Sequence, residues 1–95
     1  MAAYIVFTKE REHDADAMLA YSKAAGGTLK GHAGRPLAYY GKSESLEGPP
    51  IEGAVIIEFP SVEEAKAWYA SEGYQEARKL RFQGGDYRVF ITEGV

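Results

Sequence analysis

Short apolar runs alternate with polar stretches along this chain. The runs are rich in β-branched and aromatic residues, which favours strands, and they lie at 3–8, 35–41, 54–59 and 87–92. Between them, small and apolar residues recur at helical spacing. This spacing predicts a helix after Asp14 and helical pieces at 62–71 and 74–82. The predicted order of elements is β-α-β-β-α-β.

The boundaries of the predicted helices rest on capping and helix-breaking residues. Asp14 and Ser61 are good N-cap residues, and Glu64 stands three residues after Ser61, as in a capping box. Gly26-Gly27 is expected to end or kink the first helix. Within that helix, one shared face is expected to hold Met18, Leu19, Ser22 and Ala25. Gly73 is predicted to interrupt the second helical stretch, because glycine is costly inside a helix. Turns are expected at 43–53 and at Gly84-Gly85-Asp86.

The strands predict a second copy of the chain. Tyr4-Ile5-Val6-Phe7, Val55-Ile56-Ile57 and Val89-Phe90-Ile91 are apolar at consecutive positions. Since successive strand residues point to opposite faces, both faces of the sheet are apolar. Two helices cover only one face, so we expect a homodimer that covers the other.

The segment from Glu58 to Arg81 resembles the DUF1330 family of small domains of unknown function. It carries the pattern E-F-P-S, then E-x-A, W-Y-x-S, Y-Q and a closing arginine. The resemblance extends over nearly the whole chain, with departures at His32-Ala33-Gly34 and Pro36. It implies an α+β fold: a ferredoxin-like antiparallel four-stranded sheet with two helices on one face, which dimerises as an α/β barrel.

Composition narrows the classes of function. The 95 residues suit a single domain, 1–95. A net charge of −3 argues against nucleic acid as the main partner, and the absence of cysteine excludes a disulfide framework or a thiol nucleophile. The N-terminus does not resemble a signal peptide, and no apolar run approaches the ~20 residues of a membrane span. We therefore expect a cytoplasmic protein that does not act at a membrane.

Motifs for phosphates and metals are weak. Gly41-Lys42-Ser43 resembles the end of a phosphate-binding loop, but proline stands at position 36, where that loop needs its first glycine. His13 lies near Asp14 and Asp16, but no second histidine follows at helical spacing. We predict no metal site and no tightly bound cofactor.

Glu58 and His32 are the candidate catalytic residues. Glu58 is a carboxylate at the end of an apolar strand, so it is either a general base or the partner of Arg35, Arg78 or Arg81. His32 precedes the second strand and is either a loop residue or a proton-transfer group at the mouth of a pocket. By analogy of fold alone, a haem ligand is a third possibility for His32.

Five residues are candidates for ligand binding: Arg35, Tyr40, Trp68, Tyr69 and Arg81. Arg35 pairs with an acid or holds an anionic ligand. Tyr40 is expected on the opposite strand face from Tyr39. The aromatic side chains either fill the core or line a pocket, and Arg81 either forms a cationic rim with Arg78 or solvates a helix face.

Two functional classes are compatible with these observations. One is a binder or enzyme for a small aromatic, carbonyl or anionic metabolite, held between sheet and helices. The other is a non-catalytic dimeric structural or interaction module. The two differ in an observable way, because a binder has an apolar pocket with convergent polar groups, whereas a structural module has that space filled.

Overall fold

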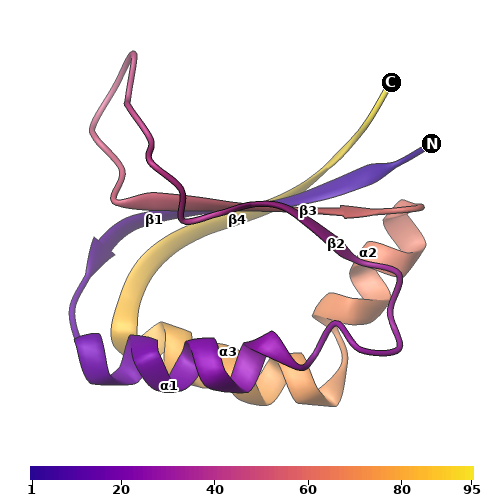
Figure 1. The fold of residues 1–95 in the computed structure, drawn as a ribbon, viewed down its shortest axis with the longest axis horizontal. Helices are drawn as coiled ribbons and strands as arrows, with labels where there is room; N and C mark the ends of the chain where they lie inside the picture. The colour runs from indigo at the N-terminus through magenta and orange to yellow at the C-terminus, as the bar shows by residue number, and fades with distance from the viewer.

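The computed structural model describes residues 1–95 and has a sheet covered on one face by helices. The strands are β1 (Ala3–Glu12), β2 (Arg35–Tyr39), β3 (Gly53–Phe59) and β4 (Gly85–Glu93). They pair antiparallel in the order β2-β3-β1-β4. The helices α1 (Ala15–Gly26), α2 (Val62–Tyr69) and α3 (Glu72–Gly84) lie below the sheet in Figure 1. The predicted βαββαβ order is confirmed, with the second helix divided into α2 and α3.

Side-chain caps set the helix starts. Asp14 Oδ1 accepts hydrogen bonds from the backbone N–H groups of Asp16 and Ala17, and Ser61 Oγ accepts one from the N–H of Glu64. The predicted break at Gly73 is wrong. The chain turns at Ser71, whose Oγ donates to the Trp68 carbonyl at 2.6 Å and accepts from the Tyr74 N–H at 3.4 Å. One hydroxyl thus closes α2 and caps α3.

The predicted turn at Gly84-Gly85-Asp86 is also absent, because α3 runs to Gly84 and β4 begins at Gly85. A Cβ atom at Gly84 would lie 2.6 Å from the Met18 sulfur. The missing side chain therefore lets α1 and α3 pack closely at this point.

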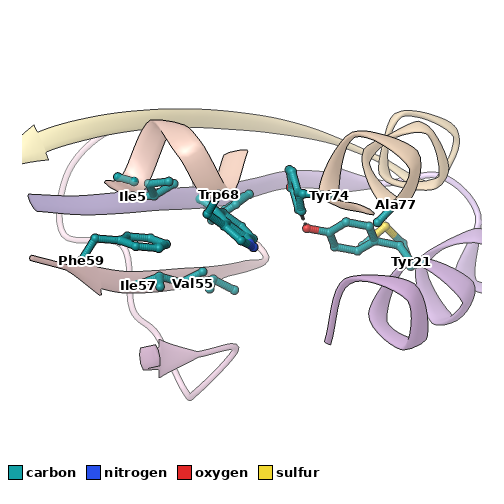
Figure 2. Close-up of a cluster of buried hydrophobic side chains, with 11 residues drawn as sticks. Ile5, Tyr21, Val55, Ile57, Phe59, Trp68, Tyr74 and Ala77 are labelled. Atoms are coloured by element: carbon teal, nitrogen blue, oxygen red, sulfur yellow. Dashed lines mark hydrogen bonds between the residues drawn. The ribbon is translucent and has the colours of Figure 1, made fainter. Parts of the chain in front are cut away.

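The hydrophobic core lies between the sheet and the helices (Figure 2). The inward-facing residues of β1 and β3 alternate with less buried ones, as strand geometry requires. From α1 the buried residues are Ala17, Met18 and Tyr21. Leu19 is exposed, so the prediction that it shares a face with Met18 is wrong. Met18 and Tyr21 are three residues apart, and Leu19 lies about 100° round the helix from Met18.

The opposite face of the sheet carries no helix in Figure 1. Val6 pairs with Ile56 on one side and with Phe90 on the other, which places an apolar row across three strands. Burial on β3 alternates between fully buried positions and positions such as Ile56 that are only partly buried. Phe90 is 50% exposed. We call this uncovered side of the sheet the open face.

We expect Gly34→Ala to destabilise the fold where β2 begins. A Cβ atom at Gly34 would lie 2.6 Å from Leu29 Cδ2 and 2.7 Å from Phe59 Cε2. Overpacking of this kind costs about 1–3 kcal/mol. Gly41→Ala is the matched control, because no atom lies within 4 Å of its added Cβ. Urea unfolding at fixed protein concentration measures both variants, and equal stabilities would contradict the prediction.

Candidate functional site

An apolar cavity of about 230 Å³ lies between the sheet and the helices, beneath β2 and β3. Its deep walls are buried side chains, among them Phe7, Ile57, Trp68 and Tyr74. The exposed lining residues Gly26, Pro36 and Tyr39 place its mouth between the end of α1 and the edge strand β2. An apolar cavity of roughly 150 Å³ is enough to bind benzene, so this space suits a small planar ligand.

Tyr40 enters the cavity because of its backbone conformation. Its φ is +51°, in the left-handed region that non-glycine residues rarely adopt. This breaks the strand alternation after β2, so Tyr39 and Tyr40 both line the cavity and their ring centroids are 4.9 Å apart. The prediction that these two tyrosines occupy opposite faces is therefore wrong. Gly53 makes room for the Tyr40 ring, because a Cβ there would lie 2.8 Å from Tyr40 Cδ1.

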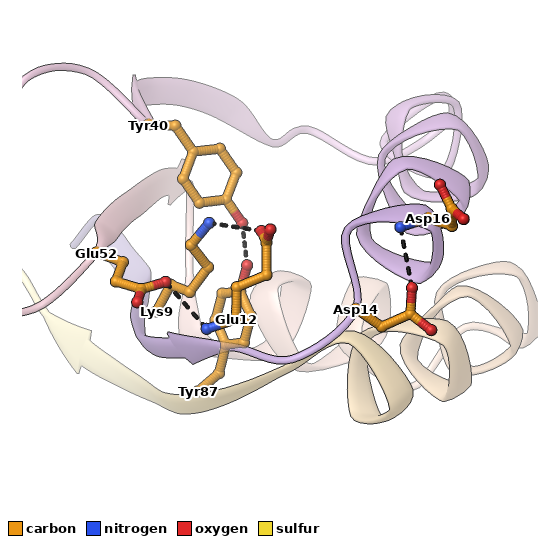
Figure 3. Close-up of polar contacts among 7 residues, drawn as sticks. All are labelled: Lys9, Glu12, Asp14, Asp16, Tyr40, Glu52 and Tyr87. Atoms are coloured by element: carbon orange, nitrogen blue, oxygen red, sulfur yellow. Dashed lines mark hydrogen bonds and ion pairs between the residues drawn. The ribbon is translucent and has the colours of Figure 1, made fainter.

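Paired tyrosine hydroxyls supply the polar groups at the cavity. Tyr21 and Tyr74 are joined by a hydrogen bond of 2.9 Å (Figure 2), and Tyr40 is joined to Tyr87 of β4 by one of 2.5 Å (Figure 3). Three of the four, all except Tyr87, line the cavity. Each pair uses one of its two hydroxyl protons internally, so one proton of each pair stays available to a ligand.

The Trp68 ring forms another wall. Its Nε1–H donates to Thr28 Oγ1 at 3.1 Å, and the Thr28 hydroxyl donates in turn to the Ala25 carbonyl at 2.7 Å. The polar atom of the indole is thereby satisfied, and the rest of the ring packs against Tyr74 and Phe59 at centroid distances of 4.3 and 5.7 Å.

Arg81 lies next to the Tyr40–Tyr87 pair, does not line the cavity, and is only 3% exposed. Its guanidinium carbon stands 5.1 Å from the Tyr87 ring centroid and 5.8 Å from that of Phe7. The ion pairs of the molecule join other residues, and Arg81 Nε has no hydrogen-bond partner. Buried charges are normally paired, so aromatic faces in place of a carboxylate make this position unusual.

Burial raises the pKa of all four paired tyrosines above the ordinary value, while the positive charge of Arg81 opposes that rise in each. The hydroxyls therefore stay protonated at neutral pH. They are suited to donate hydrogen bonds to a ligand oxygen and not to act as bases.

Of the sequence-predicted residues, Tyr40 and Trp68 line the cavity and Arg81 lies next to its tyrosines. Tyr69 lies outside the lining, where its hydroxyl accepts a hydrogen bond of 3.1 Å from Arg78 Nη1. His32 lies in the connection between α1 and β2 and is not part of the lining.

Arg35 and Glu58 lie at the open face. Arg35 Nη2 is 2.7 Å from Glu58 Oε1, and the Tyr4 hydroxyl donates to Glu58 Oε2 at 3.4 Å. Both residues line a second, shallower hollow beside the N-terminus. The predicted acid partner of Arg35 is thus Glu58, and the sheet separates this pair from the cavity. The catalytic role of Glu58 and His32 stays a prediction.

Sequence reasoning missed Tyr21, Tyr74 and Tyr87 as polar groups of the site. Periodicity places all three toward the core: Tyr21 lies three residues after Met18, and Tyr87 alternates with Val89 and Ile91. No sequence signal identifies which hydroxyls meet, since Tyr21–Tyr74 and Tyr40–Tyr87 are separated by 53 and 47 residues.

No group of three or more His, Asp or Glu side chains is arranged to hold a metal ion. None of the helices has the length and apolar character needed to cross a bilayer.

We predict that stability falls steeply at alkaline pH. Because the folded pKa of Tyr21 and Tyr74 lies above the unfolded value, their contribution is fully present below about pH 10 and is lost as pH rises toward the folded values. The expected slope is about 1.4 kcal/mol per pH unit for each tyrosine. Urea unfolding at about pH 8 and about pH 11 measures it.

The control for this prediction is the double variant Tyr21→Phe/Tyr74→Phe. It removes both titrating hydroxyls and leaves neither without a partner. Its stability should fall less steeply than that of the wild type over the same interval. An identical slope in both proteins would show that these phenols do not titrate with unfolding.

Solved structures share the fold at low sequence identity. A protein of unknown function from Rhodopseudomonas palustris is 22% identical with a TM-score of 0.73, covering 99% of this chain and 82% of that one. A dimeric ferredoxin-like protein of unknown function from Jannaschia sp. CCS1 is 17% identical with a TM-score of 0.66, covering 99% and 100%. The fold is therefore ferredoxin-like, as predicted.

A third structure with this fold is SnoaB, a cofactor-independent oxygenase from Streptomyces nogalater. It is 7% identical with a TM-score of 0.68, covering 99% of this chain and 92% of that one. Comparison with curated proteins gives no significant match. The model of the DUF1330 family, a domain of unknown function, matches residues 2–95. The chain therefore belongs to the DUF1330 family, as its Glu58–Arg81 pattern predicts.

Proposed function

We propose that this protein binds a small planar metabolite, aromatic or with a conjugated carbonyl, in the cavity between sheet and helices. The observation that carries the proposal is the cavity itself: ten of its twelve lining residues are hydrophobic, and tyrosine hydroxyls supply its polar groups. Apolar walls with a few convergent polar groups are typical of small-molecule sites. In a purely structural module, we would expect side chains to fill this volume.

The residues around the cavity suit binding and polarisation of the ligand without a tightly bound cofactor. Neutral tyrosine hydroxyls donate hydrogen bonds to a ligand carbonyl or hydroxyl oxygen, and the nearby Arg81 charge favours negative charge there. The cofactor-independent oxygenase from Streptomyces nogalater is an example of such chemistry on this fold. At 7% identity, that likeness supports the architecture alone.

The proposed active form is a homodimer joined through the open face. Val6, Ile56 and Phe90 form its apolar row, and several related folds are dimeric proteins. Covering exposed apolar surface contributes about 25 cal/mol per Å². The Arg35–Glu58 pair then lies on the same face of the sheet as the proposed interface.

Binding is tested with 4-nitroanisole, a planar neutral probe whose absorption overlaps tryptophan emission. Trp68 is the only tryptophan and lines the cavity, so saturable quenching of its fluorescence reports occupancy. Ala25 of α1 lines the cavity, so the larger ring in Ala25→Phe should occupy part of its volume. We expect this variant to weaken binding at least about ten-fold. Ala24→Phe, at an exposed position of the same helix, should bind like the wild type. Absent quenching, or equal weakening in both variants, would contradict the proposal.

The dimer is tested by native mass spectrometry of two charge-introducing variants. We expect a dimer for the wild type and a monomer for Phe90→Asp, because an unpaired carboxylate in an apolar interface is strongly unfavourable. Leu19→Asp is the matched control, since Leu19 is 58% exposed and lies on the helical side. A wild-type monomer, or a Phe90→Asp dimer of unchanged affinity, would contradict the proposed interface.

A further inference from the structure

A positive charge without a carboxylate partner lies beside the cavity. Arg81 is 3% exposed, and aromatic rings surround its guanidinium: Phe7 from β1, Phe82 from α3 and Tyr87 from β4. Cation–π contacts offset part of the cost of burying this charge. They leave it without an anion, and Nε lacks even a hydrogen-bond acceptor.

Nearby groups do not supply that anion. Glu12, the carboxylate that acts on Tyr87, is already paired with Lys9 at 3.1 Å (Figure 3). Lys9 itself lies 5.4 Å from the Tyr40 ring centroid, but Glu12 balances its charge. The four tyrosine hydroxyls are held neutral by burial, which raises the pKa of each. Arg81 is thus the positive charge beside the cavity that has no carboxylate partner.

The charge of Arg81 reaches the cavity through the tyrosines. It lowers the pKa of Tyr21, Tyr40 and Tyr74, against the larger effect of burial, and all three line the cavity. Arg81 itself is not a lining residue. A ligand oxygen at these hydroxyls would accept a hydrogen bond from the free hydroxyl proton of each pair, and the charge of Arg81 would stabilise negative charge on that oxygen.

We propose that the cavity selects planar ligands with an acidic hydroxyl, a phenol or an enol, and holds them as the oxyanion against the Tyr21–Tyr74 and Tyr40–Tyr87 pairs, each of which keeps one free hydroxyl proton, with Arg81 as the compensating charge. This rests on the proposed function and names its ligand class. The ligand proton passes to bulk water on binding, and no bond of the protein is made or broken. The ligand's own negative charge then balances the buried guanidinium.

Electrostatics set the size of the effect. A unit charge about 6 Å away at an effective dielectric constant of about 20 favours the anion by roughly a hundred-fold. Hydrogen bonds from hydroxyls to a charged oxygen add to this preference. Allowing for partial solvation at the mouth, we expect the ionised ligand to bind at least about ten-fold more tightly than the neutral form, which lowers the pKa of the bound ligand by about one unit.

The experiment compares 4-nitrophenol, whose ionised form is distinguished by its visible absorption, with 4-nitroanisole, which cannot ionise. The wild-type protein is titrated with each probe over a pH range that spans the pKa of free 4-nitrophenol. We expect bound 4-nitrophenol to ionise at a pH at least about one unit lower than free 4-nitrophenol. This wild-type result decides the inference without any variant.

Two variants assign the effect to Arg81. Arg81→Met keeps length and suits an aromatic cage, so it should still bind 4-nitroanisole while losing the lowered pKa of bound 4-nitrophenol. Arg78→Met is the matched control: Arg78 lies on the same helix and has an unpartnered Nε, but its guanidinium contacts Tyr69 and Phe82. This variant should keep the full shift.

The outcomes separate the inference from the proposed function. If 4-nitroanisole binds while the pKa of bound 4-nitrophenol is unchanged or raised, the cavity is a ligand site but the oxyanion inference is wrong. If Arg81→Met keeps the full shift, Arg81 is not its source and the inference is overturned. If neither probe binds, the proposed function fails together with it.

Discussion

The structure depends on how a layer of aromatic side chains packs between a four-stranded sheet and its helices. Phe7, Trp68 and Tyr74 contact one another edge-on or tilted in the core between the helices and the strands. The closest backbone contacts between helices and sheet involve β1, β3 and β4. The edge strand β2 contacts the helices less than the other strands do, and the cavity lies beneath it. The cavity that we propose as a ligand site is thus a consequence of core packing with large rings.

Rings with polar ends also determine the chemistry of that space. A buried hydroxyl needs a hydrogen-bond partner, and here tyrosines satisfy one another across elements far apart in sequence. Such pairs keep a donor for a ligand, which a bond to a backbone carbonyl would not. Aromatic rings also surround Arg81, whose positive charge they stabilise only in part and which has no acidic partner. The stability of the core and the proposed ligand preference therefore rest on the same residues.

Much of the fold follows from local sequence. The apolar runs, the caps at Asp14 and Ser61 and the two-faced strands predict the element order and its layers, because those signals act over a few residues. The misplaced break at Gly73 shows the limit of propensity: the side chain of Ser71, not the flexibility of glycine, ends one helix and begins the next. Leu19 is exposed although it directly follows the buried Met18, so a shift of one position on a helix is enough to move a side chain from the core to solvent.

The candidate site was predictable only in part. The sequence identifies Tyr40, Trp68 and Arg81 as candidates because their residue types are typical of pockets. The hydrogen bond between the Tyr40 and Tyr87 hydroxyls depends on the left-handed backbone of Tyr40, which no neighbouring residue predicts. Glu58 looks unusual in sequence because a carboxylate ends an apolar strand. Its partner Arg35 lies 23 residues away and becomes adjacent only when β2 pairs with β3. Side-chain partners across strands depend on register, which short-range patterns do not define.

The most direct measurement for the central claim is a crystal structure of the protein grown with 4-nitroanisole. The account predicts the probe ring in the cavity, against Trp68 and Phe7, with a polar oxygen directed toward the hydroxyl of Tyr21, Tyr40 or Tyr74. It would be contradicted by a cavity closed by its own side chains, such as Leu29 and Tyr39, or by a probe bound only in the hollow beside Arg35 and Glu58.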